Sequence, residues 1–137
     1  MIALDTNVVA ELARAAPDTN VVRWVESHGS ELTTTAITVA EAFQGVALLP
    51  RGKRRQRLQD ATERLFGTLD GAALAFDAGA ARIYAQMHAQ RARSGKPLPV
   101  EDGMIAAICV RAGAALATRN TDDYRDLGVT LIDPWRS

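Results

Sequence analysis

Acidic residues recur where this sequence passes from a short apolar run or a loop into a helix. The carboxylates stand at Asp5, Glu41, Asp102 and the adjacent pair Asp122 and Asp123. Like charges packed together repel one another unless cations neutralise them. Carboxylate oxygens suit Mg²⁺ or Mn²⁺ better than Zn²⁺. Because a carboxylate-held divalent cation activates water and stabilises the leaving oxygen in phosphodiester cleavage, these residues indicate metal-assisted hydrolysis of a phosphoester.

Five short apolar runs predict the strands that would bring these acids together, at residues 2–4, 31–36, 72–76, 114–118 and 129–132. Helices are expected at 8–14, at 19–28, from Thr38 to near Pro50, at 52–65, after the cap Asp77 and at 100–112, where Gly113 stops the last one. Short apolar strands that alternate with helices favour a parallel sheet covered on both faces. Ligands bind outside the carboxyl ends of such strands, so the acids would meet at one edge.

Each acid also has a structural interpretation from its position alone. Asp5 could cap the first helix, and Glu41 fits the N3 position of a capping box opened by Thr38. Asp102 could be an acid that favours the N-terminal end of a helix dipole. The pair at 122–123 could form a solvated turn. Spacing alone leaves these alternatives open.

Composition describes an ordinary globular chain of 137 residues, with 16 Lys and Arg against 16 Asp and Glu. This length suits one domain, which we expect to cover residues 1–137. The single cysteine, Cys109, excludes a disulfide within the chain and favours a reducing compartment. No apolar run approaches the ~18 residues of a membrane span, and the start lacks the pattern of a secretory signal. We therefore expect a cytoplasmic protein with no membrane partner.

Charge is unevenly distributed along the chain although the total is zero. Residues 1–50 carry a net charge of −4, residues 51–100 carry +6 and residues 101–137 carry −2. Five of the seven residues from Arg51 to Arg57 are basic. This stretch is either a solvated helix face or a surface that tracks nucleic-acid phosphates. It has no interleaved aromatic residues, so base stacking on it is not supported.

Four stretches in order give the chain a resemblance to a known family. They are Ile2–Val9, Thr35–Glu41, Leu98–Ala107 and Leu116–Tyr124. Together they resemble the PIN-domain ribonucleases, and within these the VapC-type toxins of bacterial toxin–antitoxin pairs. The resemblance runs nearly end to end. It implies a PIN-like three-layer α/β fold, with a central five-stranded parallel sheet flanked by helices.

The resemblance also implies a role for each acid. The acidic centre of the family matches Asp5, Glu41 and Asp102. Its fourth acid matches Asp123 best, because the aromatic Tyr124 follows it. Asp5 and Asp102 would be the primary metal ligands, and Glu41 would complete the shell directly or through water.

Two further polar side chains complete the implied site. Asn120 stands where some relatives carry another acid, and with Asp123 it would position a second metal or the attacking water. Thr6 would support Asp5 through a hydrogen bond.

The chain departs from the family pattern at two positions. Gly103 stands where relatives usually have Ala, which is expected to loosen the helical turn that carries Asp102. Tyr124 replaces the usual Phe, a change that is expected to alter little.

The implied function is that of the toxin of a type II toxin–antitoxin pair, which cleaves RNA endonucleolytically with Mg²⁺ or Mn²⁺ and leaves a 5′-phosphate. The protein would be a homodimer bound by a small cognate antitoxin, whose tail would cover the acidic site, often by offering an Arg. One alternative is another metal-dependent phosphoesterase. A second is an aspartyl phosphotransferase with Asp5 as nucleophile, which Asn7 disfavours because a second Asp is wanted there. A third is a non-catalytic PIN-like module that only dimerises and binds partners.

Overall fold

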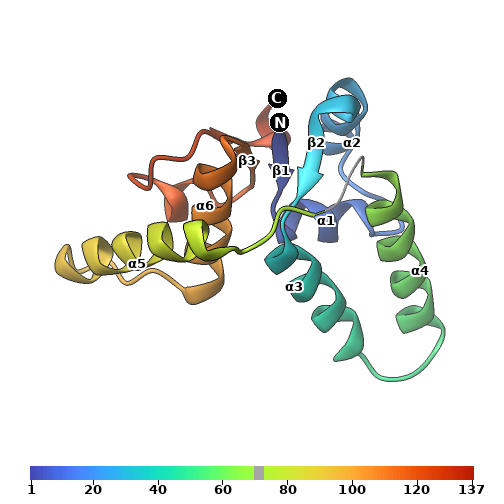
Figure 1. Cartoon of the computed structure of the whole chain (residues 1–137). Helices are drawn as coiled ribbons and strands as arrows, with labels where there is room; N and C mark the ends of the chain where they lie inside the picture. The colour runs from blue at the N-terminus through green and yellow to red at the C-terminus, as the bar shows by residue number, and fades with distance from the viewer. Residues whose placement is uncertain (70–72) are drawn as a thin grey trace.

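The computed structural model describes residues 1–69 and 73–137 (Figure 1). Its sheet consists of the parallel strands β1 (Ile2–Leu4), β2 (Leu32–Thr34), β3 (Ala115–Ala117) and β4 (Leu131–Ile132), in the order β2-β1-β3-β4. Ile2 of β1 lies opposite Leu32 on one side and opposite Ala115 on the other. The chain therefore adds strands first to one side of β1 and later to the other. This makes the carboxyl end of β1 the topological switch point, where ligands bind in open α/β sheets.

The prediction of five strands is wrong, because the described sheet has four. Of the strand expected at 72–76, Ala72 lies outside the described residues. Leu74 forms one isolated parallel bridge with Thr35 at the β2 edge. The Leu74 amide donates to the Thr34 carbonyl at 2.9 Å, and the Ala36 amide donates to the Leu74 carbonyl at 2.8 Å. The pairing stops there because α3 begins at Ala36, so the chain beyond β2 offers no further extended partner.

The α-helices of the described residues are α1 (Thr6–Leu12), α2 (Thr19–His28), α3 (Ala36–Ala47), α4 (Lys53–Thr68), α5 (Ala78–Arg93) and α6 (Val100–Ala112). The described residues also form the short 3-10 helices η1 (Gly29–Glu31), η2 (Thr121–Tyr124) and η3 (Pro134–Arg136). The predicted bounds of α2 and α6 are confirmed. Asp18 caps the first turn of α2, and Gly113, in the left-handed region at φ 69°, ends α6. Asp77 caps α5 as predicted.

The capping box predicted to open at Thr38 is wrong. Thr35 caps α3 instead, and its Oγ1 accepts a hydrogen bond from the Thr38 amide at 3.0 Å. With α3 beginning at Ala36, Glu41 is the sixth helical residue rather than the third. Glu41 therefore does not cap the helix, and its side chain is free to contact residues at the carboxyl edge of the sheet, such as Thr6.

Different helices cover the two faces of the sheet (Figure 1). On one face, Ala3 and Leu116 pack in a cluster with residues of α5 and α6 such as Ile105. On the other face, Leu4 packs in a second cluster with residues of α1 and α2 such as Val8. The carboxyl ends of the strands point between the α5–α6 pair and the α3–α4 pair (Figure 1). This parallel sheet flanked by helices is the predicted α/β arrangement.

Gly103 lets α5 and α6 approach each other closely. A Cβ at this position would lie 2.8 Å from a Tyr84 ring carbon and 2.9 Å from a Leu98 methyl carbon. Both distances are too short for real carbon contacts, so a side chain here would push the neighbours away. The structure thus gives Gly103 a packing role in place of the looser turn that the sequence predicted.

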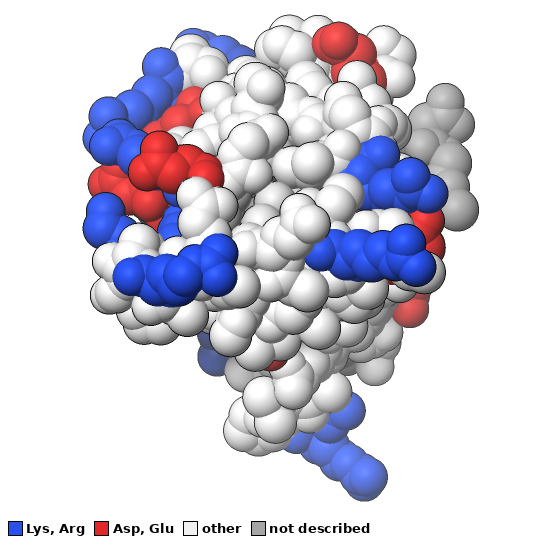
Figure 2. Space-filling model, turned by 60° about the vertical axis from the view of Figure 1, so that its left-hand side comes forward, with Lys and Arg blue, Asp and Glu red and all other residues white. Residues whose placement is uncertain are grey.

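The surface is mixed in charge. On the face that comes forward in Figure 2, Lys and Arg side chains lie around a broad uncharged area. Acidic side chains cluster among them at the left margin, and a few more lie at the top and at the right. The basic residues Arg51, Lys53, Arg54 and Arg57, at and near the start of α4, are exposed. No helix within the described residues is both long enough and apolar enough to cross a membrane.

Candidate active site

Asp5 is the most enclosed of the candidate acids, with 4% of its surface exposed. It follows β1 directly and caps α1, so its backbone is fixed by the sheet on one side and the helix on the other. Its Oδ1 accepts a hydrogen bond from the Thr6 amide at 2.8 Å. Its Oδ2 accepts one from the Thr118 hydroxyl at 2.7 Å, and Thr118 stands just after β3, the neighbouring strand. The pairing of β1 with β3 therefore holds Asp5 in place.

Asp102 lies beside Asp5 through a shared donor, the hydroxyl of Tyr124. This hydroxyl is 3.2 Å from Oδ2 of Asp5 and 3.2 Å from Oδ1 of Asp102. Asp102 belongs to the first turn of α6, and Tyr124 ends η2. The predicted convergence of these two acids at the edge of the sheet is present in the structure.

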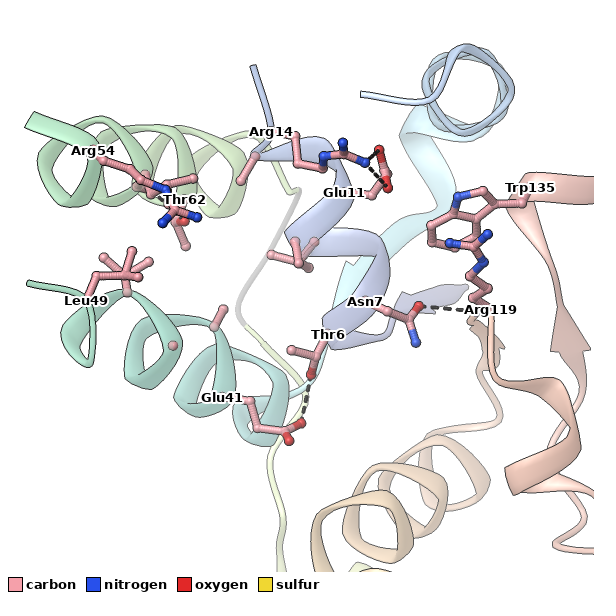
Figure 3. Close-up of a pocket in the computed structure, with 17 residues that line it drawn as sticks. Thr6, Asn7, Glu11, Arg14, Glu41, Leu49, Arg54, Thr62, Arg119 and Trp135 are labelled. Atoms are coloured by element: carbon pink, nitrogen blue, oxygen red, sulfur yellow. Dashed lines mark hydrogen bonds and ion pairs between the residues drawn. The ribbon is translucent and has the colours of Figure 1, made fainter. Parts of the chain in front are cut away.

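Glu41 reaches the same edge from α3. The Thr6 hydroxyl donates to its Oε1 at 2.7 Å, as the dashed line in Figure 3 shows. Thr6 was predicted to support Asp5, and it does so through its backbone amide, whereas its side chain binds Glu41. Thr6 thereby links Asp5 to Glu41.

Asp123 and Asp122 behave differently although they are adjacent. Burial raises the pKa of Asp102, and the charge of Asp123 adds to that rise. Asp122 instead forms an exposed ion pair with Arg125 at 2.7 Å. The charge of Asp123 thus acts on Asp102, whereas Asp122 is paired with Arg125.

Asn120 is exposed, and the contacts that the structure gives it are made by its backbone. Its amide donates to the Thr118 hydroxyl at 3.1 Å, and its carbonyl accepts from the Asp123 amide at 3.1 Å. It therefore shapes the loop that carries Asp123.

Thr118 and Asn7 also bind Asp5, and of the two only Asn7 had been predicted from the sequence to lie with Asp5 and Thr6. The Asn7 Nδ2 lies 3.4 Å from Oδ2 of Asp5 and 3.2 Å from the Thr118 hydroxyl. Its Oδ1 accepts from the Arg119 amide at 3.1 Å, so Asn7 joins α1 to the chain that follows β3. The rule that located Asp5 could have found Thr118, because both follow parallel strands at the same edge.

Electrostatics set Asp5 and Asp102 apart from ordinary surface acids. Burial raises the pKa of Asp5, and hydrogen bonds from Thr118, Thr6 and Tyr124 oppose that rise. Burial also raises the pKa of Asp102, and the charge of Asp5 adds to the rise. Two acids whose charged forms are disfavoured in this way gain from a nearby cation.

The donor set fits a hard divalent cation. No three Asp, Glu, His or Cys side chains in residues 1–69 and 73–137 stand close enough together to enclose a metal by themselves. Mg²⁺ does not need such a cage, because it is usually held by one or two carboxylates and keeps several waters. Asp5 and Asp102 supply two carboxylates, and Thr6 links Glu41 to Asp5. Oxygen donors without His or Cys suit Mg²⁺ or Mn²⁺ rather than Zn²⁺.

A groove of about 530 Å³ begins at the Thr6–Glu41 contact and runs between α1, α3 and α4 (Figure 3). Apolar side chains such as Val46 and Leu58 line much of it. Arg54 and Arg119 also line it, and the Arg119 guanidinium lies 5.0 Å from the centre of the Trp135 ring. Of the candidate acids, Glu41 lines this partly apolar groove, together with cationic side chains.

A parallel sheet with carboxylates gathered at its switch point is what the sequence predicted for a PIN domain, and comparison with known proteins confirms the resemblance. The PIN domain family matches residues 2–129, and the chain belongs to this family. The VapC ribonuclease Y4jK of Sinorhizobium fredii is 44% identical over 137 residues, which cover 98% of each chain. The toxin FitB of Neisseria gonorrhoeae is 39% identical over 137 residues, covering 98% of this chain and 99% of the relative. The crystal structure of FitAcB from Neisseria gonorrhoeae matches with a TM-score of 0.89 and 38% identity, covering 100% of both chains.

Proposed function

We propose that this protein is the toxin of a type II toxin–antitoxin pair and cleaves RNA endonucleolytically with Mg²⁺ or Mn²⁺ in the bacterial cytoplasm. Residues 1–137 would act as one PIN domain. The observation that carries the proposal is the meeting of Asp5 and Asp102 on one tyrosine hydroxyl at the switch point of the sheet. The names of the similar VapC ribonuclease and toxin FitB support it.

In this proposal Asp5 and Asp102 hold the cation, and Glu41 completes the shell directly or through water. When bound, the cation would activate water and stabilise the leaving oxygen. Asp123 would orient the attacking water or hold a second cation, and Asn120 would help to position it. Attack of water on phosphorus with departure of the 3′ oxygen leaves a 5′-phosphate.

The RNA backbone would approach along the basic start of α4. The Arg51–Arg57 stretch is largely exposed, and Arg54 also lines the groove that begins at Glu41. Exposed Arg side chains bind phosphates without reading the base sequence. This arrangement would bring the phosphate chain past the carboxylates.

The groove would also serve the antitoxin. An apolar segment could pack between α1, α3 and α4, and an Arg at its end could reach the carboxylates of the free site. Toxin activity would then be blocked by a protein that covers the acids. We expect the active unit to be a homodimer.

The decisive experiment is RNA cleavage by the purified, antitoxin-free protein with Mg²⁺ or Mn²⁺, with EDTA, and with the variant Asp5→Asn. Asn is itself a good helix cap, so this variant retains the start of α1 while it loses the charge. The matched control is Asp18→Asn, which makes the same change at the cap of α2, away from the acids.

Cleavage that requires metal and is lost only in Asp5→Asn would support the proposal. Full metal-dependent activity in a folded Asp5→Asn variant would contradict it. If the protein neither cuts RNA nor binds metal, the non-catalytic partner-binding module becomes the better interpretation.

A further inference from the structure

We propose that the Tyr124 hydroxyl is a positioning group that holds Asp5 and Asp102 at the separation and orientation in which they bind the cation. This inference rests on the proposed function, in which these two acids hold the metal. The inference gives a role to the hydroxyl by which Tyr differs from Phe at position 124.

The contacts of the hydroxyl are the first argument. Tyr124 is buried, with 1% of its surface exposed. Its oxygen stands 3.2 Å from a carboxylate oxygen of Asp5 and 3.2 Å from one of Asp102. A tyrosine hydroxyl has one proton to donate, so the two acids share a single donor. One group therefore sets the distance between two side chains that would otherwise repel each other.

The backbone around Tyr124 is held on both sides, which is the second argument. From α5, the Arg91 Nη2 donates to the Asp123 carbonyl at 2.9 Å and to the Arg125 carbonyl at 2.9 Å. The Tyr124 ring packs in the same cluster as Ala3 of β1 and residues of α6. Contacts from the sheet, α5 and α6 thus hold the hydroxyl where it reaches both Asp5 and Asp102.

The distribution of donors on Asp5 is the third argument. Its Oδ2 receives the hydroxyls of Thr118 and Tyr124 and lies 3.4 Å from the Asn7 amide nitrogen. Its Oδ1 receives the Thr6 amide. A carboxylate oxygen has two lone pairs, so Oδ1 retains capacity for a cation. Tyr124 contacts Oδ2 and so supports Asp5 from the side on which its protein donors gather.

The test compares the Mn²⁺ affinity of the wild-type protein, Tyr124→Phe and Tyr84→Phe by isothermal titration calorimetry. Phe preserves the buried ring and removes only the oxygen. Tyr84 packs against the same core cluster, and in the described part of the chain its hydroxyl contacts neither acid, so Tyr84→Phe is the matched control. Thermal unfolding of each variant in EDTA confirms that the titrations are made on folded protein.

We expect Tyr124→Phe to bind Mn²⁺ roughly tenfold more weakly, because groups that orient metal ligands typically contribute 10–100-fold to affinity. Tyr84→Phe should bind as the wild type does. Equal or tighter binding by Tyr124→Phe would overturn the inference, and so would a lower unfolding temperature with unchanged affinity. If the wild-type protein binds no Mn²⁺, the proposed function fails and the inference fails with it; normal wild-type binding with an unaffected variant refutes only the role of Tyr124.

Discussion

The candidate site has an enclosed side and an open side, and the two are built differently. On the enclosed side, Asp5 is 4% exposed and receives hydrogen bonds from the neighbouring strand, the following helix and Tyr124. On the open side, Asp123 is exposed on a short 3-10 helix. The Asp5 carboxylate is held by hydrogen bonds from the protein. Asp123 lies on a short 3-10 helix at the surface. Fixed groups are suited to hold a cation, and an exposed acid is suited to meet the substrate and water.

The largest effect is expected on the enclosed side. Asp102→Ala should lower the rate of RNA cleavage by about 10³-fold or more, because charge stabilisation of several kcal/mol is lost. Glu101→Ala, which removes the exposed neighbouring acid of the same helical turn, should leave the rate within about twofold. Single-turnover cleavage assays measure both. Similar rates for the two variants would remove Asp102 from the site.

The next effect concerns the donor that fixes Asp5. Thr118 is fully buried, and its hydroxyl donates to Asp5 at 2.7 Å. Thr118→Val should lower the free energy of unfolding by about 1.5–3 kcal/mol, as expected for a hydrogen bond to a charged group. Thr62→Val, which removes a buried hydroxyl bound to a helix carbonyl in α4, should cost about 0.5–1.5 kcal/mol. Urea denaturation of both variants measures the two losses in free energy of unfolding. Equal losses would mean that the hydrogen bond from Thr118 to Asp5 is no stronger than an ordinary hydrogen bond from a buried hydroxyl.

A smaller effect is expected on the open side. Asp123→Asn should reduce cleavage by roughly tenfold, in the range of a single positioned proton-transfer or water-orienting group. Asp122→Asn should change it by less than about twofold, because Asp122 is occupied by Arg125 in an exposed ion pair, a type that contributes little. The ratio of the two rates measures which acid serves the site. A larger loss in Asp122→Asn would reverse the assignment.

The smallest effect is on stability as a function of pH in EDTA. Burial and the charge of Asp5 raise the pKa of Asp102 above its ordinary value of 3.8, so the folded protein holds this proton more tightly than the unfolded chain. The resulting stabilisation is complete below about pH 3.8 and is lost as the pH rises through the folded pKa. Relative to Asp102→Asn, the wild-type unfolding temperature should fall as the pH rises above about 4. If the unfolding temperatures of the two proteins change in parallel with pH, the surroundings of Asp102 do not disfavour its charged form.

Sequence patterns predicted the parts of the fold that depend on neighbours in the chain. The bounds of α2 and α6 followed from a capping Asp and from a Gly in the left-handed region. The start of α3 was mispredicted because Thr35 and Thr38 are both good caps, and only the structure shows that Thr35 takes the role. The strand expected at 72–76 is reduced to the bridge at Leu74, because the length of a strand depends on how far its partner stays extended.

The sequence by itself determined which acids could meet, since Asp5 follows one short apolar strand and Asp102 opens the helix that leads into another strand of the parallel sheet. Only the tertiary structure decided how they are held. Tyr124 lies 119 positions from Asp5 and 22 from Asp102 along the chain. No local pattern encodes such a contact, because it depends on the approach of α6, η2 and β1 within one packed core. The identity of the acids can therefore be predicted from the sequence, whereas the distance between them is set by the tertiary structure.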